Sequence, residues 1–252
     1  MQEKFPNQIE QVQGTEVEKS EESLEIKIPE IAELRKPMQQ LLLQLRKSIE
    51  KGEYAVILGD DASGRIPTLL FRKVLNALYT ERRFEVPKTL FFAGVRFDTM
   101  PRQRQVKMAQ DFTDYLVKEN VKGLTENRKA LVVTDTISSG QTLKNFMQVL
   151  RELGIHYNIA TIGRLYGRTE RLGGKIASAQ KAIPSIYGYG QHKYGGVEKD
   201  RDNPSLFAKR MSGSTPYEVQ KLSRARSQAR KDVDILARQL VEWYETQNSA
   251  KE

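Results

Sequence analysis

One stretch of the sequence combines a carboxylate, several hydroxyl groups and a glycine in a spacing that suits phosphate. Residues 130–133 are apolar, and the acid Asp135 follows them closely. Small polar residues then surround one glycine: Thr136, Ser138, Ser139, Gly140, Gln141 and Thr142. The backbone N–H groups and hydroxyls of such a loop can donate to a phosphate dianion, and glycine permits close approach. Because Asp135 can accept from a ribose hydroxyl, the stretch predicts a site for a phosphate monoester next to a vicinal diol.

A second loop of similar type lies earlier in the chain. The apolar run 54–58 ends in Gly59–Arg65, and a helical pattern follows it. Arginine at a helix start opposes the helix dipole unless an anion lies beside it, so Arg65 favours an anionic ligand there. The acids Asp60 and Asp61 are expected to face solvent or to cap the helix. A tight turn alone would also use the glycines, so a second phosphate loop and an ordinary turn both fit.

Single residues exclude several other reaction centres. A Walker A loop needs a lysine before its hydroxylated residue, whereas Gln141 precedes Thr142. Neither Ser63 nor Ser139 has the glycine two positions earlier that a nucleophile elbow needs. The sequence has no cysteine and only 2 histidines, which removes thiolate chemistry and disfavours a histidine-based triad or metal site.

The elements that must position these loops alternate between strands and helices. Apolar runs predict strands at 54–58, 88–97, 130–133, 157–162 and 185–189, with a short edge strand at 24–28. Apolar spacing of three and four predicts helices from Pro29 (kinked or divided at Pro37), from Ile66, through Met108–Val117 and across Leu143–Leu153. A polar, basic loop is expected at 98–105. The alternation predicts an α/β fold with a mainly parallel sheet flanked by helices.

The composition divides the chain into three regions. Residues 1–23 are rich in Glu and Gln and are expected to form a disordered acidic tail, residues 24–200 the α/β domain, and residues 201–252 a C-terminal extension. Thr215–Glu218 resembles a capping box that starts a long amphipathic helix. One face of this helix is basic, with Arg224, Arg226, Arg230, Lys231 and Arg238. This pattern predicts a docked terminal helix with a solvated basic face, or alternatively a nucleic-acid contact.

The net charge of the chain is +9, and the acidic first region makes the remainder more basic still. A basic body favours phosphorylated metabolites, nucleotides or nucleic acid as partners, although a solvated basic surface fits equally well. No apolar run approaches the ~20 residues of a membrane helix, so we expect no membrane contact. The lack of cysteine fits a reducing compartment. We therefore expect a cytoplasmic protein, and we also expect a homo-oligomer.

The stretch Leu131–Thr142 resembles the phosphoribosyl-pyrophosphate-binding motif of type I phosphoribosyltransferases, in which an apolar strand and two acids precede a small hydroxylated loop. By element order, the resemblance extends loosely over residues 24–189 and implies that fold. It implies ribose and phosphate contacts at Thr134, Asp135, Thr136, Ser138, Ser139, Gly140, Gln141 and Thr142. It implies pyrophosphate contacts at Ser63, Gly64 and Arg65, and a covering basic loop with Arg102, Arg104 and Lys107. Asp135, Arg102 and Arg104 would then be the catalytic residues.

The resemblance also implies a reaction. A nitrogen nucleophile of a base displaces pyrophosphate at ribose C1 through an oxocarbenium-like transition state, so the protein mainly positions the reactants. Mg²⁺ would bridge the pyrophosphate and ribose oxygens, with few protein ligands, and no residue is assigned to it.

Two residues depart from the family pattern. Thr134 stands where the family has the first of two acids, and losing a hydrogen bond to a charged group costs about 1.5–3 kcal/mol. Ser138 stands where purine-specific members have an acid that assists the base. A phosphoribosyltransferase is the favoured function. The alternatives are a non-catalytic regulator that senses phosphoribosyl pyrophosphate or nucleotides, a nucleic-acid-binding protein on the same fold, and a scaffold whose site has decayed.

Overall fold

The central element of the fold is a sheet of five parallel strands in the order β2-β1-β3-β4-β5. The strands are β1 (Tyr54–Asp60), β2 (Lys88–Phe92), β3 (Lys129–Ile137), β4 (Tyr157–Arg164) and β5 (Lys175–Gln180). A separate antiparallel pair consists of β6 (Val197–Glu198) and β7 (Lys209–Arg210). The computed structural model describes residues 25–62, 64–93, 100–121, 128–137, 140–164, 172–180, 194–195, 197–198 and 205–249. The predicted acidic tail and the predicted strand 185–189 lie outside these ranges.

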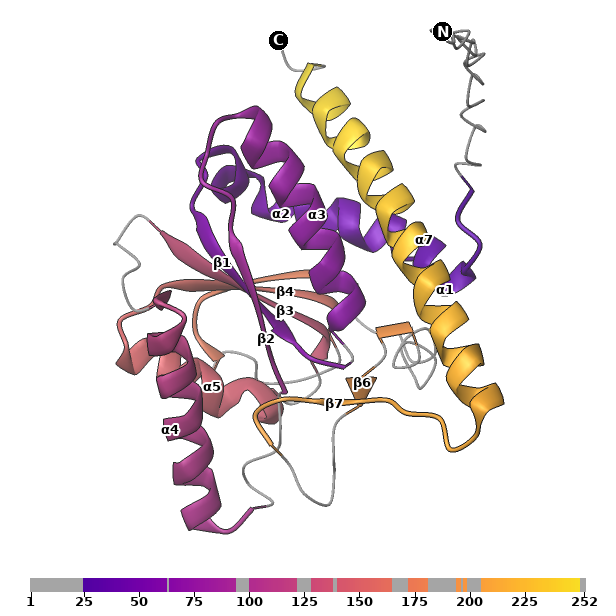
Figure 1. The fold of residues 1–252 in the computed structure, drawn as a ribbon. Coiled ribbons are helices and arrows are strands. Elements are labelled where there is room, and N and C mark those ends of the chain that lie inside the picture. The colour runs from indigo at the N-terminus through magenta and orange to yellow at the C-terminus, as the bar shows by residue number, and fades with distance from the viewer. Residues whose placement is uncertain are drawn as a thin grey trace, which may run out of the picture.

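Helices cover both faces of the sheet (Figure 1). They are α1 (Pro29–Ala32), α2 (Arg35–Glu50), α3 (Arg65–Glu81), α4 (Arg102–Lys118), α5 (Gln141–Glu152) and α7 (Pro216–Ser249). α2 and α3 pack on one face, with α1 and α7 outside them, and α4 and α5 pack on the other. The predicted α/β fold with a mainly parallel, helix-flanked sheet is confirmed. Among the described residues, none of the helices has the length and apolar character needed to cross a membrane.

The two faces of the sheet have separate apolar cores, and β3 contributes to both. Leu131 and Val133 belong to the core under α2 and α3, whereas Ala130 and Val132 belong to the core under α4 and α5. This division follows from the strand geometry, because successive side chains point to opposite faces. A strand covered on both faces needs apolar residues at every position, which is why the run was readable in the sequence.

The chain before the sheet differs from the prediction in one respect. Residues 25–28 are not in a strand, so the predicted edge strand is wrong. The backbone N–H of Ile28 instead donates to the buried carboxylate of Asp232 on α7, at 2.7 Å. The helix predicted from Pro29 is divided, as expected: the turn residues Glu33 and Leu34 separate α1 from α2, and Pro37 lies in the first turn of α2. Pro37 has no N–H to donate to the carbonyl of Glu33, four residues earlier.

The edge strand β5 was missed by the sequence prediction. Its residues are mostly small or polar, with Ile176 as the one β-branched residue, and give no strong strand signal. Contacts with α2 hold it in place: the Gln44 side chain accepts from the Ser178 N–H at 3.1 Å and donates to the Ser178 carbonyl at 2.9 Å. The Lys175 ammonium donates to the Gln44 carbonyl at 2.7 Å. This strand is therefore specified by tertiary contacts rather than by its own sequence.

The predicted docked C-terminal helix is confirmed. The Glu218 N–H donates to the Thr215 hydroxyl and the Thr215 N–H donates to the Glu218 carboxylate, both at 3.2 Å, so the predicted capping box begins α7. Further along, a stripe of buried residues packs against α2 and α3; it comprises Ala229, Val233, Leu236, Leu240 and Tyr244. The C-terminal region thus shares one core with the sheet.

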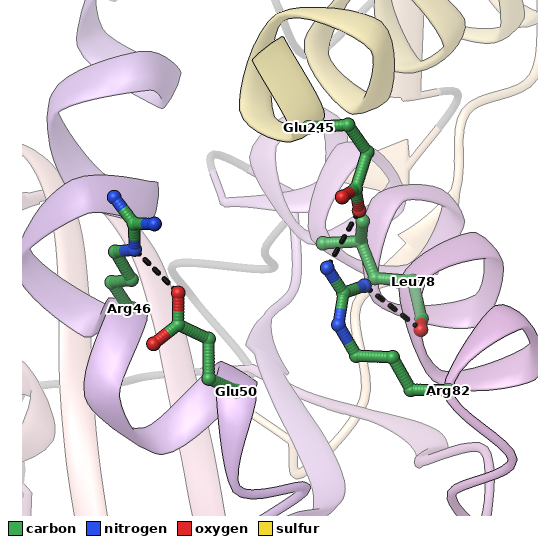
Figure 2. Close-up of polar contacts among 5 residues, drawn as sticks. All are labelled: Arg46, Glu50, Leu78, Arg82 and Glu245. Atoms are coloured by element: carbon green, nitrogen blue, oxygen red, sulfur yellow. Dashed lines mark hydrogen bonds and ion pairs between the residues drawn. The ribbon is translucent and has the colours of Figure 1, made fainter. Parts of the chain in front are cut away.

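Polar contacts reinforce the far end of this packing (Figure 2). Arg82, which follows α3, donates to the Leu78 carbonyl at 3.1 Å and to the Glu245 carboxylate of α7 at 2.7 Å. On α2, Arg46 pairs with Glu50, one helical turn away. Because Arg82 lies between two helices, it ties the end of α3 to α7.

Candidate functional site

The carboxyl ends of β1 and β3 form the point where the sheet changes direction. β1 leads through α3 to β2 on one side, and β3 leads through α5 to β4 on the other. Right-handed crossovers then place α3 and α5 on opposite faces, so the two loops diverge from neighbouring strands. Ligands of open α/β sheets bind in the crevice that this divergence leaves. The two loops singled out in the sequence leave β1 and β3, so the structure brings them to one place.

The β1–α3 loop carries its own internal anion. The carboxylate of Asp61 accepts from the Ala62 N–H at 3.1 Å and from the Arg65 guanidinium at 2.6 Å. Arg65 also lies over the ring of Phe91, with its guanidinium carbon 4.6 Å from the ring centroid. Asp61 is buried, while Arg65 keeps 27% of its side-chain surface exposed. The anion that the sequence predicted beside Arg65 is therefore supplied in part by the protein.

Close packing fixes the path of this loop over β3. A β-carbon added at Gly64 would lie 2.7 Å from the Asp60 carbonyl oxygen and 3.0 Å from backbone atoms of Val133 and Thr134. Since those contacts are all with backbone, no side-chain movement could relieve them. Ala62, just before, adopts a left-handed backbone conformation with φ of 73°. Gly64 is thus required by the approach of α3 to β3, and its predicted pyrophosphate contact stays a prediction.

Thr134 bridges β1 and β3 near the carboxyl ends of the two strands. Its hydroxyl donates to Asp60 Oδ2 at 3.1 Å, and both residues are buried, with 1% and 4% of their surfaces exposed. A carboxylate therefore lies directly beside the position where the family resemblance calls for a first acid. It comes from β1 rather than from β3. The hydroxyl of Thr134 donates inside the protein and keeps its lone pairs as acceptors, and its contact with a ligand stays a prediction.

The acid of the second loop lies within the strand. β3 continues through Asp135 and Thr136 to Ile137, four residues further than the apolar run suggested. Asp135 is partly buried, and its Oδ1 accepts from the Thr136 N–H at 2.6 Å. The carbonyl of Asp135 accepts from the hydroxyl of Thr161 on β4 at 3.1 Å. These bonds hold Asp135 at the carboxyl edge of the sheet, and its contact with a ribose hydroxyl stays a prediction.

The start of α5 faces the same edge. Gly140 is its N-cap and has a left-handed φ of 75°, a conformation that favours glycine. A β-carbon there would also meet the side chain of Leu172 at 3.2 Å. Gln141 and Thr142 begin the helix, and the partly buried Thr142 hydroxyl makes no hydrogen bond to another described residue. The remaining predicted contacts, at Ser63, Ser138 and Ser139, lie outside the described residues.

The basic residues expected to cover the site lie on a helix. α4 begins at Arg102, where the N–H groups of Arg104 and Gln105 donate to the Pro101 carbonyl at 3.0 and 3.1 Å. The predicted loop was therefore wrong for residues 102–105. Proline suits a helix start, and the buried Met108, one and a half turns on, docks the helix on the sheet. The catalytic roles of Arg102 and Arg104 stay predictions.

The metal-ligating side chains near the crevice do not form a preassembled site. Within the described ranges, no three His, Asp or Glu side chains gather as ligands for one ion. Oxygen donors are nevertheless present, since Asp60 and Asp135 belong to neighbouring strands. Such donors suit Mg²⁺ when most of its ligands come from a bound phosphate or from water.

A scan of protein-family models and a search of curated proteins both find no match to this chain.

The structural roles of Asp60 and Asp61 were the main site features that sequence reasoning missed. Both were expected to face solvent or cap a helix, yet 4% and 5% of their surfaces are exposed. Asp61 does act on the start of α3, through Arg65. A signal for their burial existed, because both follow an uninterrupted apolar run of the type found in strands covered on both faces.

Proposed function

We propose that this protein binds phosphoribosyl pyrophosphate or a ribonucleotide through the crevice between β1 and β3, with the 5′-phosphate at the start of α5. The observation that supports this best is the position of the strand–acid–glycine loop–helix unit. It lies at the point of the sheet where ligands bind in such folds, next to a second glycine loop. The chain is proposed to act as a type I phosphoribosyltransferase.

The 5′-phosphate is assigned to α5 because donors converge there. α5 is 12 residues long, so its start carries the positive end of a helix dipole, and the N–H of Thr142 has no partner among the described residues. The hydroxyl of Thr142 makes no hydrogen bond within the described chain and adds a side-chain donor. Gly140 keeps the backbone bare at the turn. A phosphate dianion gains from all three features together.

The ribose is assigned to Asp135, with Asp60 behind it. Asp135 lies near the strand end and is partly buried, and a carboxylate has several lone pairs besides the one that accepts from the Thr136 N–H, so it can also accept from a ribose hydroxyl. Asp60 adds negative charge to the floor of the crevice and is held by Thr134. An oxocarbenium-like transition state carries positive charge at C1, which nearby carboxylates stabilise.

Pyrophosphate is assigned to the β1–α3 loop, where it would share Arg65 with Asp61. The guanidinium has further N–H donors beyond the one that bonds Asp61. Mg²⁺ would accompany the ligand, because its pyrophosphate and ribose oxygens can supply most of the ion's coordination. With the ion neutralising the leaving group, the described residues have to bind and orient the ligand rather than transfer a proton.

Calorimetric titration with phosphoribosyl pyrophosphate and Mg²⁺ tests the proposal. Thr142→Val keeps the shape of the side chain and removes its donor, so we expect binding about tenfold weaker. Asp135→Asn keeps the acceptor of the Thr136 N–H and removes the charge, and should also weaken binding. Thr80→Val is the matched control, since Thr80 is exposed near the opposite end of α3. Equal affinity of the wild type, Thr142→Val and Thr80→Val would refute the assignment.

A second candidate function is a non-catalytic regulator or nucleic-acid-binding protein. The observation that favours it is the exposed basic face of α7, on which Arg224, Arg230 and Lys231 face solvent. Pyrophosphate release, measured with purine, pyrimidine and nicotinamide-like bases, separates the two. Release with any base supports the transferase, whereas ligand binding without release supports the regulator. The absence of cysteine fits a reducing compartment, so we place either function in the cytoplasm.

A further inference from the structure

A groove between α3 and α7 lies apart from the crevice and is large enough for a peptide segment. Its volume is about 820 Å³, and the chain just before α1 forms one edge through Glu25 and Lys27. Its apolar floor includes the buried Ile235 and Ala237, with Val241 beside them. Side chains of these types pack against polypeptide more readily than against a solvated polyanion.

The rim of the groove has an excess of positive charge. Five cationic side chains and three acidic ones line it; the cations are Lys27, Arg72, Lys73, Lys231 and Arg238. Lys73 pairs with Asp234 across the groove. Arg72 and Arg238 are exposed, and neither makes an ion pair or hydrogen bond with another described residue. The rim therefore has charges to offer an acidic occupant.

An unmet acceptor indicates that the occupant carries hydrogen-bond donors. The Oδ1 atom of Asn76, on the α3 side of the groove, is buried and has no partner within the described chain. A buried acceptor without a donor costs about 1–3 kcal/mol. Peptide N–H groups can donate to it, whereas the phosphate oxygens that dominate non-specific nucleic-acid binding can only accept. This atom favours polypeptide over nucleic acid as the occupant.

The chain itself supplies an acidic segment at the edge of the groove. Residues 16–24 carry Glu16, Glu18, Glu21 and Glu22 with a single lysine, and they directly precede Glu25. On α7 the lining runs from Gln228 to Glu242. At 1.5 Å per residue this wall is about 21 Å long, which about seven extended residues can follow. We propose that the acidic segment 16–24 binds in this groove of its own chain.

Tethering makes such an intramolecular contact effective even when each ion pair is weak. A short connection gives an effective concentration in the millimolar range, so exposed pairs of modest strength suffice. Exposed pairs are also screened by salt, with a Debye length of about 10 Å at 0.1 M and about 3 Å at 1 M. The contact is therefore expected to weaken as salt rises. It is independent of the proposed ligand in the crevice.

Methyl NMR of the full chain tests the inference, with Ile235 in the groove floor as the probe. The double variant Glu21→Lys with Glu22→Lys should shift the Ile235 signal, and so should raising the salt from about 0.05 to 0.5 M. The matched control, Glu3→Lys with Glu10→Lys, changes the net charge equally but lies outside the segment 16–24 in the sequence. It should leave the Ile235 signal in place.

Charge reversal on the groove side provides the complementary test. The double variant Arg72→Glu with Arg238→Glu should shift the Ile235 signal in the same direction. Combining these two changes with Glu21→Lys and Glu22→Lys should restore the wild-type signal. The proposal would be overturned if the control variant Glu3→Lys with Glu10→Lys shifted the Ile235 signal equally. It would also be overturned if Glu21→Lys with Glu22→Lys left that signal in place. A different result would assign the groove to nucleic acid. In that case the protein would bind single-stranded RNA in a salt-sensitive way, Arg72→Glu with Arg238→Glu would abolish the binding, and the tail variants would leave the Ile235 signal in place.

Discussion

The bond between Thr134 and Asp60 offers a sharp test of how the crevice is built. Thr134→Val replaces the hydroxyl by a methyl group of similar size, so the packing around a residue with 1% exposure is preserved. Asp60, which is 4% exposed, loses a donor at 3.1 Å. A hydrogen bond to a charged group contributes about 1.5–3 kcal/mol, and water has little access to replace it. We expect the free energy of unfolding to fall by that amount.

Urea unfolding measures this loss as a lower midpoint with an unchanged slope. A double-mutant cycle with Asp60→Ala attributes it to the pair: once Asp60 is gone, Thr134→Val should cost little. The coupling energy of residues in direct contact is typically about 0.5–3 kcal/mol. A midpoint for Thr134→Val within error of the wild type would refute the reasoning, as would additive effects of the two changes.

The same pair predicts the behaviour of Thr134→Asp, which restores the two adjacent acids of the family pattern. Its new carboxylate would lie beside that of Asp60, with both buried. Like charges at such a distance cannot both ionise, so the pKa of one carboxyl should rise. Its folded-state pKa then exceeds its unfolded value, so the variant should be most unstable near neutral pH and recover as the pH falls. A variant as stable as the wild type at pH 7 would contradict this.

Three further predictions concern other parts of the fold. Gly64→Ala forces a β-carbon against the backbone of β1 and β3, so it should lower the free energy of unfolding in urea by about 1–3 kcal/mol. A variant as stable as the wild type would contradict the close approach of the two backbones. Burial raises the pKa of Tyr54 and of Tyr244 to about 12. The stabilising contribution of the two neutral phenols is therefore complete below pH ~10 and is lost as the pH rises through ~12. A melting temperature that stays constant up to pH ~11.5 would oppose this. Glu218→Ala removes the capping box, so amide hydrogen exchange should become faster in the first turn of α7 while the midpoint of global unfolding stays unchanged. Slow exchange in that turn of the variant would show that the capping box is dispensable.

The parts of the fold that could be predicted are those whose signal lies within a few neighbouring residues. β1, β3 and β4 are covered on both faces and therefore read as continuous apolar runs. The division before Pro37 and the capping box of α7 follow equally from local backbone chemistry. The parallel direction of the strands also followed, since alternating strands and helices predict a parallel sheet.

The parts that could not be predicted depend on partners distant in the sequence. β5 is held by Gln44, more than 130 residues earlier, and its own residues give no strong strand signal. Asp60 and Thr134 are 74 residues apart, so the sequence showed a missing acid at Thr134 but not the carboxylate beside it. The Asp61–Arg65 pair is different, because its spacing of four residues was readable but was not used.

The most direct test of the central claim is to locate a bound phosphoribosyl group on the chain. Backbone amide NMR during titration with ribose 5-phosphate reports this residue by residue. We predict saturating shifts at Gly140, Gln141 and Thr142, with the Thr80 signal unmoved. Saturating shifts confined to the basic face of α7, with the start of α5 silent, would contradict a phosphoribosyl site at β1 and β3.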